Sequence, residues 1–185
     1  MNTTSLKNSS LFGLSDTVES ADIVVVPVPW DLTTSYHHGT ANGPGAIQKA
    51  SYQLDLSHPW AGQVWKQGIA MTEFPNELME LNQRLRPIAS KIMADIENDV
   101  TGDHSSGLSV INEACESMVQ HVYSETAQYL SMDKAVILLG GEHGVGLGYY
   151  KALEEEYGSF GILQIDAHMD LRLNYLGMTY SHASC

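Results

Sequence analysis

The chain has 185 residues, enough for one domain with a hydrophobic core, and its 9 Lys and Arg against 22 Asp and Glu give a formal net charge of −13. Nucleic acids and anionic membrane surfaces are bound by clustered Lys and Arg, so this balance argues against both as partners. With no recognisable signal peptide, no apolar run long enough to span a bilayer and only two cysteines, we expect a cytoplasmic protein. The acidic surface suits a small cationic substrate, or serves only to keep the protein soluble.

The first part of the chain predicts an arm and then a strand. Residues 1–20 are rich in Ser, Asn and Thr without periodicity, so we expect a flexible or loosely draped N-terminal arm there. We expect residues 21–185 to form part of a single domain. Its first element is the β-branched run Ala21–Trp30, which is typical of a strand covered on both faces.

A loop with two adjacent histidines, His37 and His38, follows this strand and ends in Gly39. Neighbouring side chains on an extended loop point apart, which disfavours metal binding by the pair but leaves it open. Strand-to-helix loops at the carboxyl edge of a parallel sheet line active-site crevices, so contact of His38 and Gly39 with substrate fits better. Asn and Pro in the next turn indicate a helix from Gly45 to about Leu54.

The middle of the chain is predominantly helical. A short strand is predicted around residues 68–71. Apolar residues at helical spacing predict a helix over residues 76–98, which Pro87 should kink or split. A longer helix with one apolar stripe is predicted over residues 108–130.

The last third predicts a βαβ unit of a parallel sheet. Ala135–Leu139 is a second buried strand, a helix runs on to Tyr157, and Gly158 is expected to cap that helix. The apolar run Phe160–Ile165 then predicts a third strand beside it. The carboxyl ends of the two strands should therefore lie at one edge of the sheet.

Candidate metal ligands follow both strands of this unit. Asp166, His168 and Asp170 alternate after the predicted strand, and the period of two would direct all three side chains to one spot. His143 follows the preceding strand and should share the same edge. Carboxylate and imidazole ligands suit borderline divalent ions, and four such ligands exceed what one open Zn²⁺ site normally takes. We therefore predict two divalent ions, which together would activate a water for hydrolysis.

The glycine-rich turn Gly140–Gly148 has a second interpretation, a phosphate cradle at a helix N-terminus. Its spacing fits neither the dinucleotide fingerprint nor the P-loop, the turn contains no Lys, and Glu142 would repel a phosphate. A doubly wound nucleotide-binding domain is therefore kept only as a third hypothesis.

Four segments in family order resemble motifs of the ureohydrolases, the arginase, agmatinase and formiminoglutamase family. Gly-Gly-Glu-His-Gly at 140–144 resembles the family's Gly-Gly-Asp-His-Ser, and Asp-Ala-His-Met-Asp at 166–170 matches Asp-Ala-His-x-Asp. Residues 181–184 are similar to the His-Gly motif that follows, and residues 35–47 resemble the first Gly-x-x-x-Gly-Pro-x-Ala-Ile segment. The agmatinase branch is the most similar.

The resemblance implies a three-layer α/β/α fold with a parallel sheet and a binuclear manganese centre, or nickel in some relatives. By motif, His143 would bind the first ion, Asp166 would bridge both, His168 would bind the second, and Asp170 would return to the first. Asp166 and His182 would be catalytic, with His182 near the substrate as a proton shuttle or guanidinium contact. The implied reaction splits a guanidino compound into urea and an amine, in a homo-oligomer of three or six chains.

The sequence departs from the family pattern in several places. Glu142, Gly144 and Ala183 replace the family's Asp, Ser and Gly, and nothing matches a later Ser-x-Asp-x-Asp motif whose carboxylates complete both metal shells. We therefore expect the N-terminal portion of a longer enzyme, with a sheet incomplete at its C-terminal side. The alternative is an inactive fragment or pseudoenzyme that keeps the fold as an assembly subunit. The guanidino substrate and the metal stay open.

Overall fold

The computed structural model describes residues 10–185. Of the predicted N-terminal arm, residues 1–9 lie outside the described residues. In the remainder, Leu11 is 4% exposed, and the Phe12 amide donates a hydrogen bond of 2.9 Å to Ser51 Oγ. Residues 10–12 are thus held against the domain.

Three parallel strands form the sheet, in the order β2-β1-β3. They are β1 (Ile23–Val28), β2 (Ile69–Met71) and β3 (Ala135–Gly140). Val25 of β1 lies opposite Met71 of β2 and Ile137 of β3, so the strands run in register from one edge of the sheet to the other. All three coincide with predicted strands, where β-branched and aliphatic side chains suit a sheet covered on both faces.

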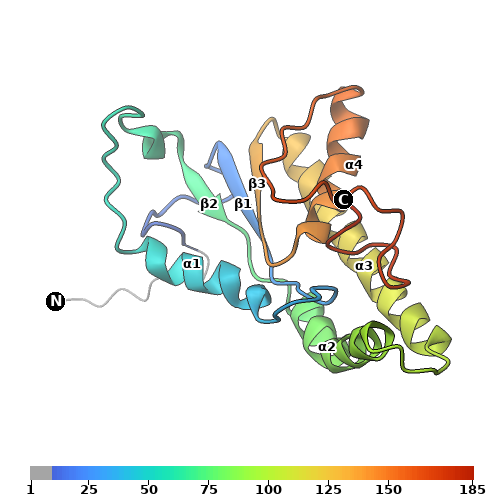
Figure 1. Ribbon diagram of the computed structural model, residues 1–185. Helices are drawn as coiled ribbons and strands as arrows, with labels where there is room; N and C mark the ends of the chain where they lie inside the picture. The colour runs from blue at the N-terminus through green and yellow to red at the C-terminus, as the bar shows by residue number, and fades with distance from the viewer. Residues whose placement is uncertain (1–9) are drawn as a thin grey trace.

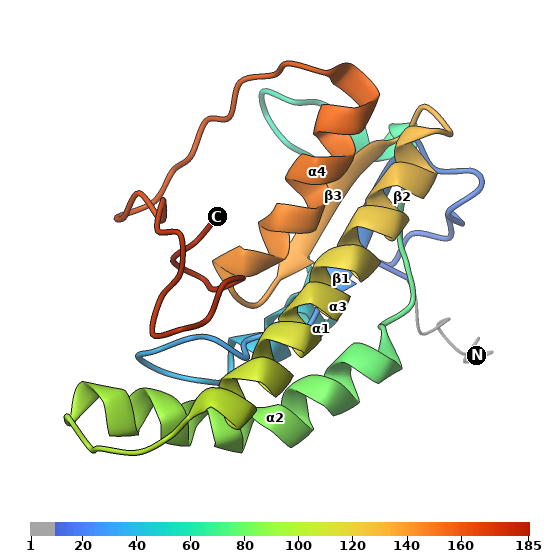
Figure 2. The same cartoon turned by 90° about the vertical axis from the view of Figure 1, so that its right-hand side faces the viewer.

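Residues 10–185 also form four α-helices and three short 3₁₀ helices, of which η3 and α4 follow the last strand (Figure 1). They are η1 (Thr40–Asn42), α1 (Gly43–Ser51), η2 (Val64–Gln67), α2 (Asn76–Glu97), α3 (Ser105–Leu130), η3 (His143–Val145) and α4 (Gly146–Tyr157). Pro87 does not split α2, which stays one helix and changes direction along its length (Figure 2). Gly158 ends α4 with φ of 70°, as predicted. None of the helices in residues 10–185 is long and apolar enough to cross a membrane.

The two faces of the sheet are covered differently. Val24, Val26 and Val28 of β1, each at most 1% exposed, pack in one core with the apolar stripes of α2 and α3 and with Ala152 of α4. The alternate residue Val25 packs with Leu11 and Met71 in a smaller core on the other face, on the side of α1. The result is the expected α/β/α arrangement, with a sheet left open at β3.

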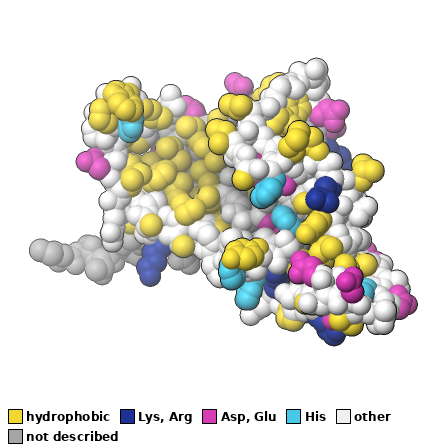
Figure 3. Space-filling model, in the orientation of Figure 1, with side chains coloured by type: hydrophobic (Ala, Val, Ile, Leu, Met, Phe, Trp, Pro, Cys, Tyr) yellow, Lys and Arg dark blue, Asp and Glu magenta, His cyan; other side chains and the backbone are white. Residues whose placement is uncertain are grey.

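The prediction of a strand at Phe160–Ile165 is wrong. The segment is extended but pairs with no described strand, and Ile162, Leu163 and Ile165 are 56%, 87% and 92% exposed. A strand is stable only when a neighbouring strand satisfies its backbone and covers its side chains. Neither condition is met here, so the βαβ unit is not completed within residues 10–185. Ile137 of β3, in the strand at the open edge of the sheet, is 50% exposed, and Figure 3 shows hydrophobic side chains gathered over the sheet.

Candidate functional site

A cavity of about 1060 Å³ opens where β1 and β3 end. Its walls come from the loop after β1, the start of η3, residues 166–172 and His182. Parallel strands bring these loops to one edge of the sheet, as expected for a site in an open α/β domain. The cavity therefore contains most of the predicted site residues.

Three predicted ligands meet in this cavity. His143 Nδ1 lies 2.7 Å from Asp170 Oδ2 and 3.5 Å from Asp166 Oδ2. One possible ligand atom from each of the three residues lies within 4.8 Å of the others. The side chains are only partly exposed, at 27% for His143, 30% for Asp166 and 12% for Asp170. One imidazole and two carboxylates at this spacing fit a divalent ion with mixed nitrogen and oxygen preference.

His168 does not join this cluster. Its side chain is 82% exposed, and its Nδ1 lies 3.8 Å from Asp166 Oδ1 at the rim of the cavity. The expectation that strand alternation aligns the three side chains is wrong, because residues 166–170 form a loop. The His168 amide donates a 2.8 Å hydrogen bond to Asp166 Oδ1, and Asp170 has a left-handed φ of 51°. These turns bring Asp166 and Asp170 together and leave His168 outside.

His182 lies on the opposite wall. Its amide donates a 2.9 Å hydrogen bond to Thr33 Oγ1, and its Nε2 lies 3.5 Å from Ser35 Oγ. Its buried Nδ1 has no hydrogen-bond partner among residues 10–185. Burial lowers the pKa of this imidazole, so the ring is neutral near pH 7 and can accept a proton.

The loop that contains His37 and His38 forms part of the cavity wall. Tyr36 and His37 line the cavity, with their rings 4.3 Å apart, whereas His38 and Gly39 do not line it. The Gly39 amide donates a 2.6 Å hydrogen bond to Asp31 Oδ2, at a φ of 114° that favours glycine. Gly39 thus helps to fix the conformation of the loop without lining the cavity. Contact of His38 or Gly39 with substrate stays a prediction.

A buried carboxyl group that the sequence did not assign to the site links two of the segments that line the cavity. Glu142 is 6% exposed and accepts hydrogen bonds of 2.9 Å from the amide and the hydroxyl of Thr33. Burial raises the pKa of Glu142 to about 8, although both hydrogen bonds from Thr33 act to lower it. Glu142 therefore fixes the loop after β1 against the start of η3.

A second unassigned network anchors the same loop to α2. Asp31 exchanges hydrogen bonds of 2.9 and 3.0 Å with the buried Asn82, and Arg86 donates to the carbonyls of Asp31, Leu32 and Thr34. Asn82 and Arg86 are one helical turn apart on a face that also carries buried leucines. In the sequence, two polar residues at that spacing within an apolar stripe were the sign that this helix face takes part in a polar network.

Fold and donor set together define a parallel α/β protein with a histidine–carboxylate cluster at the carboxyl edge of its sheet. Residues 21–185 match the model of the Arginase family, and the chain belongs to that family.

The similar proteins are about twice as long. N(1)-aminopropylagmatine ureohydrolase of Thermus thermophilus is 31% identical over 176 residues, which are 94% of this chain and 49% of that protein. Agmatinase of Bacillus cereus is 27% identical over 90% of this chain and 46% of its own length. The solved agmatine ureohydrolase of Thermoplasma volcanium superposes with a TM-score of 0.64 at 25% identity, over 92% of this chain and 46% of that one. The chain spans about half the length of the curated relatives it matches.

Proposed function

We propose that the chain holds a divalent metal at His143, Asp166 and Asp170 and hydrolyses a C–N bond of a small cationic guanidino compound, giving urea and an amine. The observation that carries the proposal is the cluster of one imidazole and two carboxylates within 4.8 Å. Family membership and relatives called agmatinase and aminopropylagmatine ureohydrolase support the substrate class.

The metal would be manganese, with nickel as the alternative, because both accept mixed imidazole and carboxylate ligands. A pair of such ions would supply an activated water for attack on the guanidino carbon. His168 is the predicted residue for a second ion. A cytoplasmic homo-oligomer of three or six chains remains part of the proposal.

The remaining site residues have separate roles. Neutral His182 would accept or deliver a proton at the leaving nitrogen through Nε2, because its Nδ1 is buried away from the cavity. Tyr36 and His37 would cover the open side of the cavity and exclude water from the bound substrate. Glu142 would hold Thr33, and through it His182, opposite the metal ligands.

Metal content tests the site independently of turnover. After dialysis against Mn²⁺, elemental analysis should find bound metal in the wild type and about tenfold weaker binding in Asp170→Asn. The matched control is Asp133→Asn, an exposed residue in the turn before β3 whose left-handed φ of 58° suits asparagine. His182→Ala should keep the metal and lose urea release from agmatine. Equal metal binding by Asp170→Asn and Asp133→Asn would contradict the assignment.

A second candidate is an assembly subunit that binds metal without turnover. The exposed apolar residues Ile137, Leu163 and Ile165 favour it, because such side chains usually mark a surface that another chain covers. Metal bound without urea release, in a chain that forms oligomers by light scattering, would select this candidate.

A further inference from the structure

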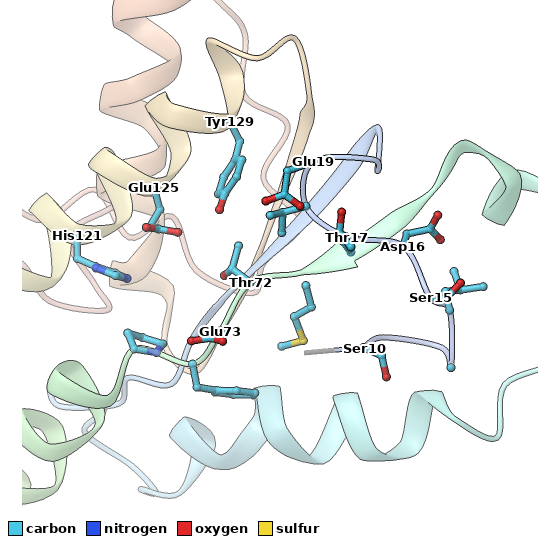
Figure 4. Close-up of a pocket in the computed structure, with 17 residues that line it drawn as sticks. Ser10, Ser15, Asp16, Thr17, Glu19, Thr72, Glu73, His121, Glu125 and Tyr129 are labelled. Atoms are coloured by element: carbon cyan, nitrogen blue, oxygen red, sulfur yellow. The ribbon is translucent and has the colours of Figure 1, made fainter. Parts of the chain in front are cut away.

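A second cavity, of about 900 Å³, lies away from the candidate metal site. Its walls are residues 10–19, the end of β2 with the residues that follow it, and α3 (Figure 4). None of its lining residues lines the cavity around His143. The volume is in the range of small-molecule sites in proteins.

Carboxylates from three separate segments line this second cavity, without any Lys or Arg among the lining residues. They are Asp16, Glu19, Glu73 and Glu125 (Figure 4). Glu73 and Glu125 make no hydrogen bond or ion pair with another residue of the described part of the chain. Lys134 lies outside the lining, where its ammonium donates to the Glu19 carbonyl at 3.0 Å. The cavity is therefore strongly acidic.

Two buried residues direct hydroxyl groups into the same space. Tyr129 is 7% exposed and Thr72 is 8% exposed, and neither hydroxyl makes a hydrogen bond within residues 10–185. Figure 4 shows both side chains extending into the region between Glu125 and Glu19. Neither hydroxyl is among the fully enclosed groups without a partner in residues 10–185, so both open onto the cavity and can form a hydrogen bond with a ligand there.

The arrangement of the acids argues for an extended organic cation over a metal ion. Within residues 10–185, the cluster at His143 is the only group of three potential ligands whose atoms approach within 4.8 Å of one another, so no three acids of this cavity converge on one point. Apolar side chains lie between them, including Val18, Met71 and Phe74. Separated carboxylates with apolar walls complement a molecule with cationic ends and a hydrocarbon stem.

We propose that this cavity binds a linear aliphatic diamine, with one ammonium at Glu125, Tyr129 and Thr72 and the other toward Asp16 or Glu73. An ammonium carries three donors, which these carboxylate and hydroxyl oxygens accept. Burial, together with the charges of Glu125 and Glu19, raises the pKa of Tyr129, so its hydroxyl stays protonated and uncharged as an acceptor. The methylene stem lies against Met71 and Phe74.

Calorimetric titration of the 185-residue chain with 1,4-diaminobutane, without added metal, tests the proposal. Glu125→Gln should weaken binding about tenfold, as expected for one charge-assisted hydrogen bond, and Tyr129→Phe should weaken it several-fold. Glu116→Gln is the matched control, since it makes the same change on an exposed part of α3 outside the cavity and should bind like wild type.

Two further ligands and one further variant separate the alternatives. 1-Aminobutane should bind at least about tenfold more weakly than the diamine, because it has one cationic end. Mg²⁺ should not displace the diamine at equal concentration. Asp170→Asn should leave diamine binding unchanged. Binding lost in Asp170→Asn but kept in Glu125→Gln would place the diamine at the candidate metal site, and equal binding by Mg²⁺ or 1-aminobutane would likewise overturn the proposal.

Discussion

Gly148 sets how closely α4 approaches α3, and replacing it with alanine should destabilise the protein. A Cβ added at Gly148 would lie 2.8 Å from the Tyr123 nitrogen and 2.9 Å from Val122 Cβ, and closer still to the Val119 carbonyl oxygen. Two of these contacts are with the α3 backbone, so no side-chain rotation relieves them and the helices must separate. Overpacking of this kind costs about 1 to 3 kcal/mol.

The direction of the change in unfolding free energy distinguishes overpacking from helix propensity. Alanine is favoured over glycine inside a helix by about 1 kcal/mol, so without the close approach Gly148→Ala would stabilise α4. With it, we expect a net loss of about 2 kcal/mol, because contact with backbone atoms puts the overpacking cost at the top of its range. For a urea slope of about 2 kcal/mol per molar, the unfolding midpoint should fall by about 1 M.

Gly45→Ala is the matched control, because Gly45 lies in α1 and a Cβ there would meet no atom within 4 Å. Its midpoint should stay the same or rise. Since α4 follows η3 directly, Gly148→Ala should also move His143 away from Asp170 and weaken Mn²⁺ binding, whereas Gly45→Ala should not. A Gly148→Ala midpoint at or above that of wild type, with an unchanged urea slope, would refute the packing argument.

Two further predictions concern the buried network at Asp31. Asn82→Ala removes both hydrogen bonds to Asp31 and should lower the free energy of unfolding by about 2 kcal/mol, whereas Gln83→Ala, on the exposed side of α2, should leave it within about 0.5 kcal/mol in urea titrations. Burial alone would raise the pKa of Asp31, but hydrogen bonds from Asn82, Gly39 and Ala41 and the charge of Arg86 lower it below 3.8. A lowered folded-state pKa stabilises the protein above 3.8, and this contribution is lost as the pH falls through the folded-state value. Asp31→Asn should therefore show a shallower loss of stability than wild type between about pH 5 and pH 2, and an equal slope would contradict the assigned pKa direction.

The sheet was predictable where strands pair within the described chain. The runs that become β1 and β3 are aliphatic on both faces, which is how a covered parallel strand is recognised. Phe160–Ile165 is also predominantly apolar, with Gly161 and Gln164 among its residues, yet it remains an unpaired loop. Composition reports that a segment can form a strand, whereas pairing depends on a neighbour elsewhere in the chain.

The candidate site was predictable where local motifs carry it and not where distant polar residues pair. His143, Asp166 and Asp170 stand in recognisable motifs, and the structure brings them together. The contact between Thr33 and Glu142 joins residues 109 positions apart, and neither side chain has a local pattern that names its partner. His168 shares the motif of its neighbours but lies outside the cluster, because a loop does not keep the alternation of a strand.

The contact between Thr33 and Glu142 also explains how a loop can hold two carboxylates at the site without a strand. Thr33 donates to Glu142 and accepts from the amide of His182, which fixes the last residues of the chain against the loop after β1. The last residues in turn hold the loop that contains Asp166 and Asp170. The Cys185 amide donates a 2.8 Å hydrogen bond to the Asp170 carbonyl, and the Arg172 amide donates a 3.1 Å hydrogen bond to the Ala183 carbonyl. Asp170 is therefore positioned through hydrogen bonds that lead back to Glu142, the neighbour of His143. Because one buried carboxyl group is linked to both His143 and Asp170, the candidate metal ligands and His182 depend on the same few contacts.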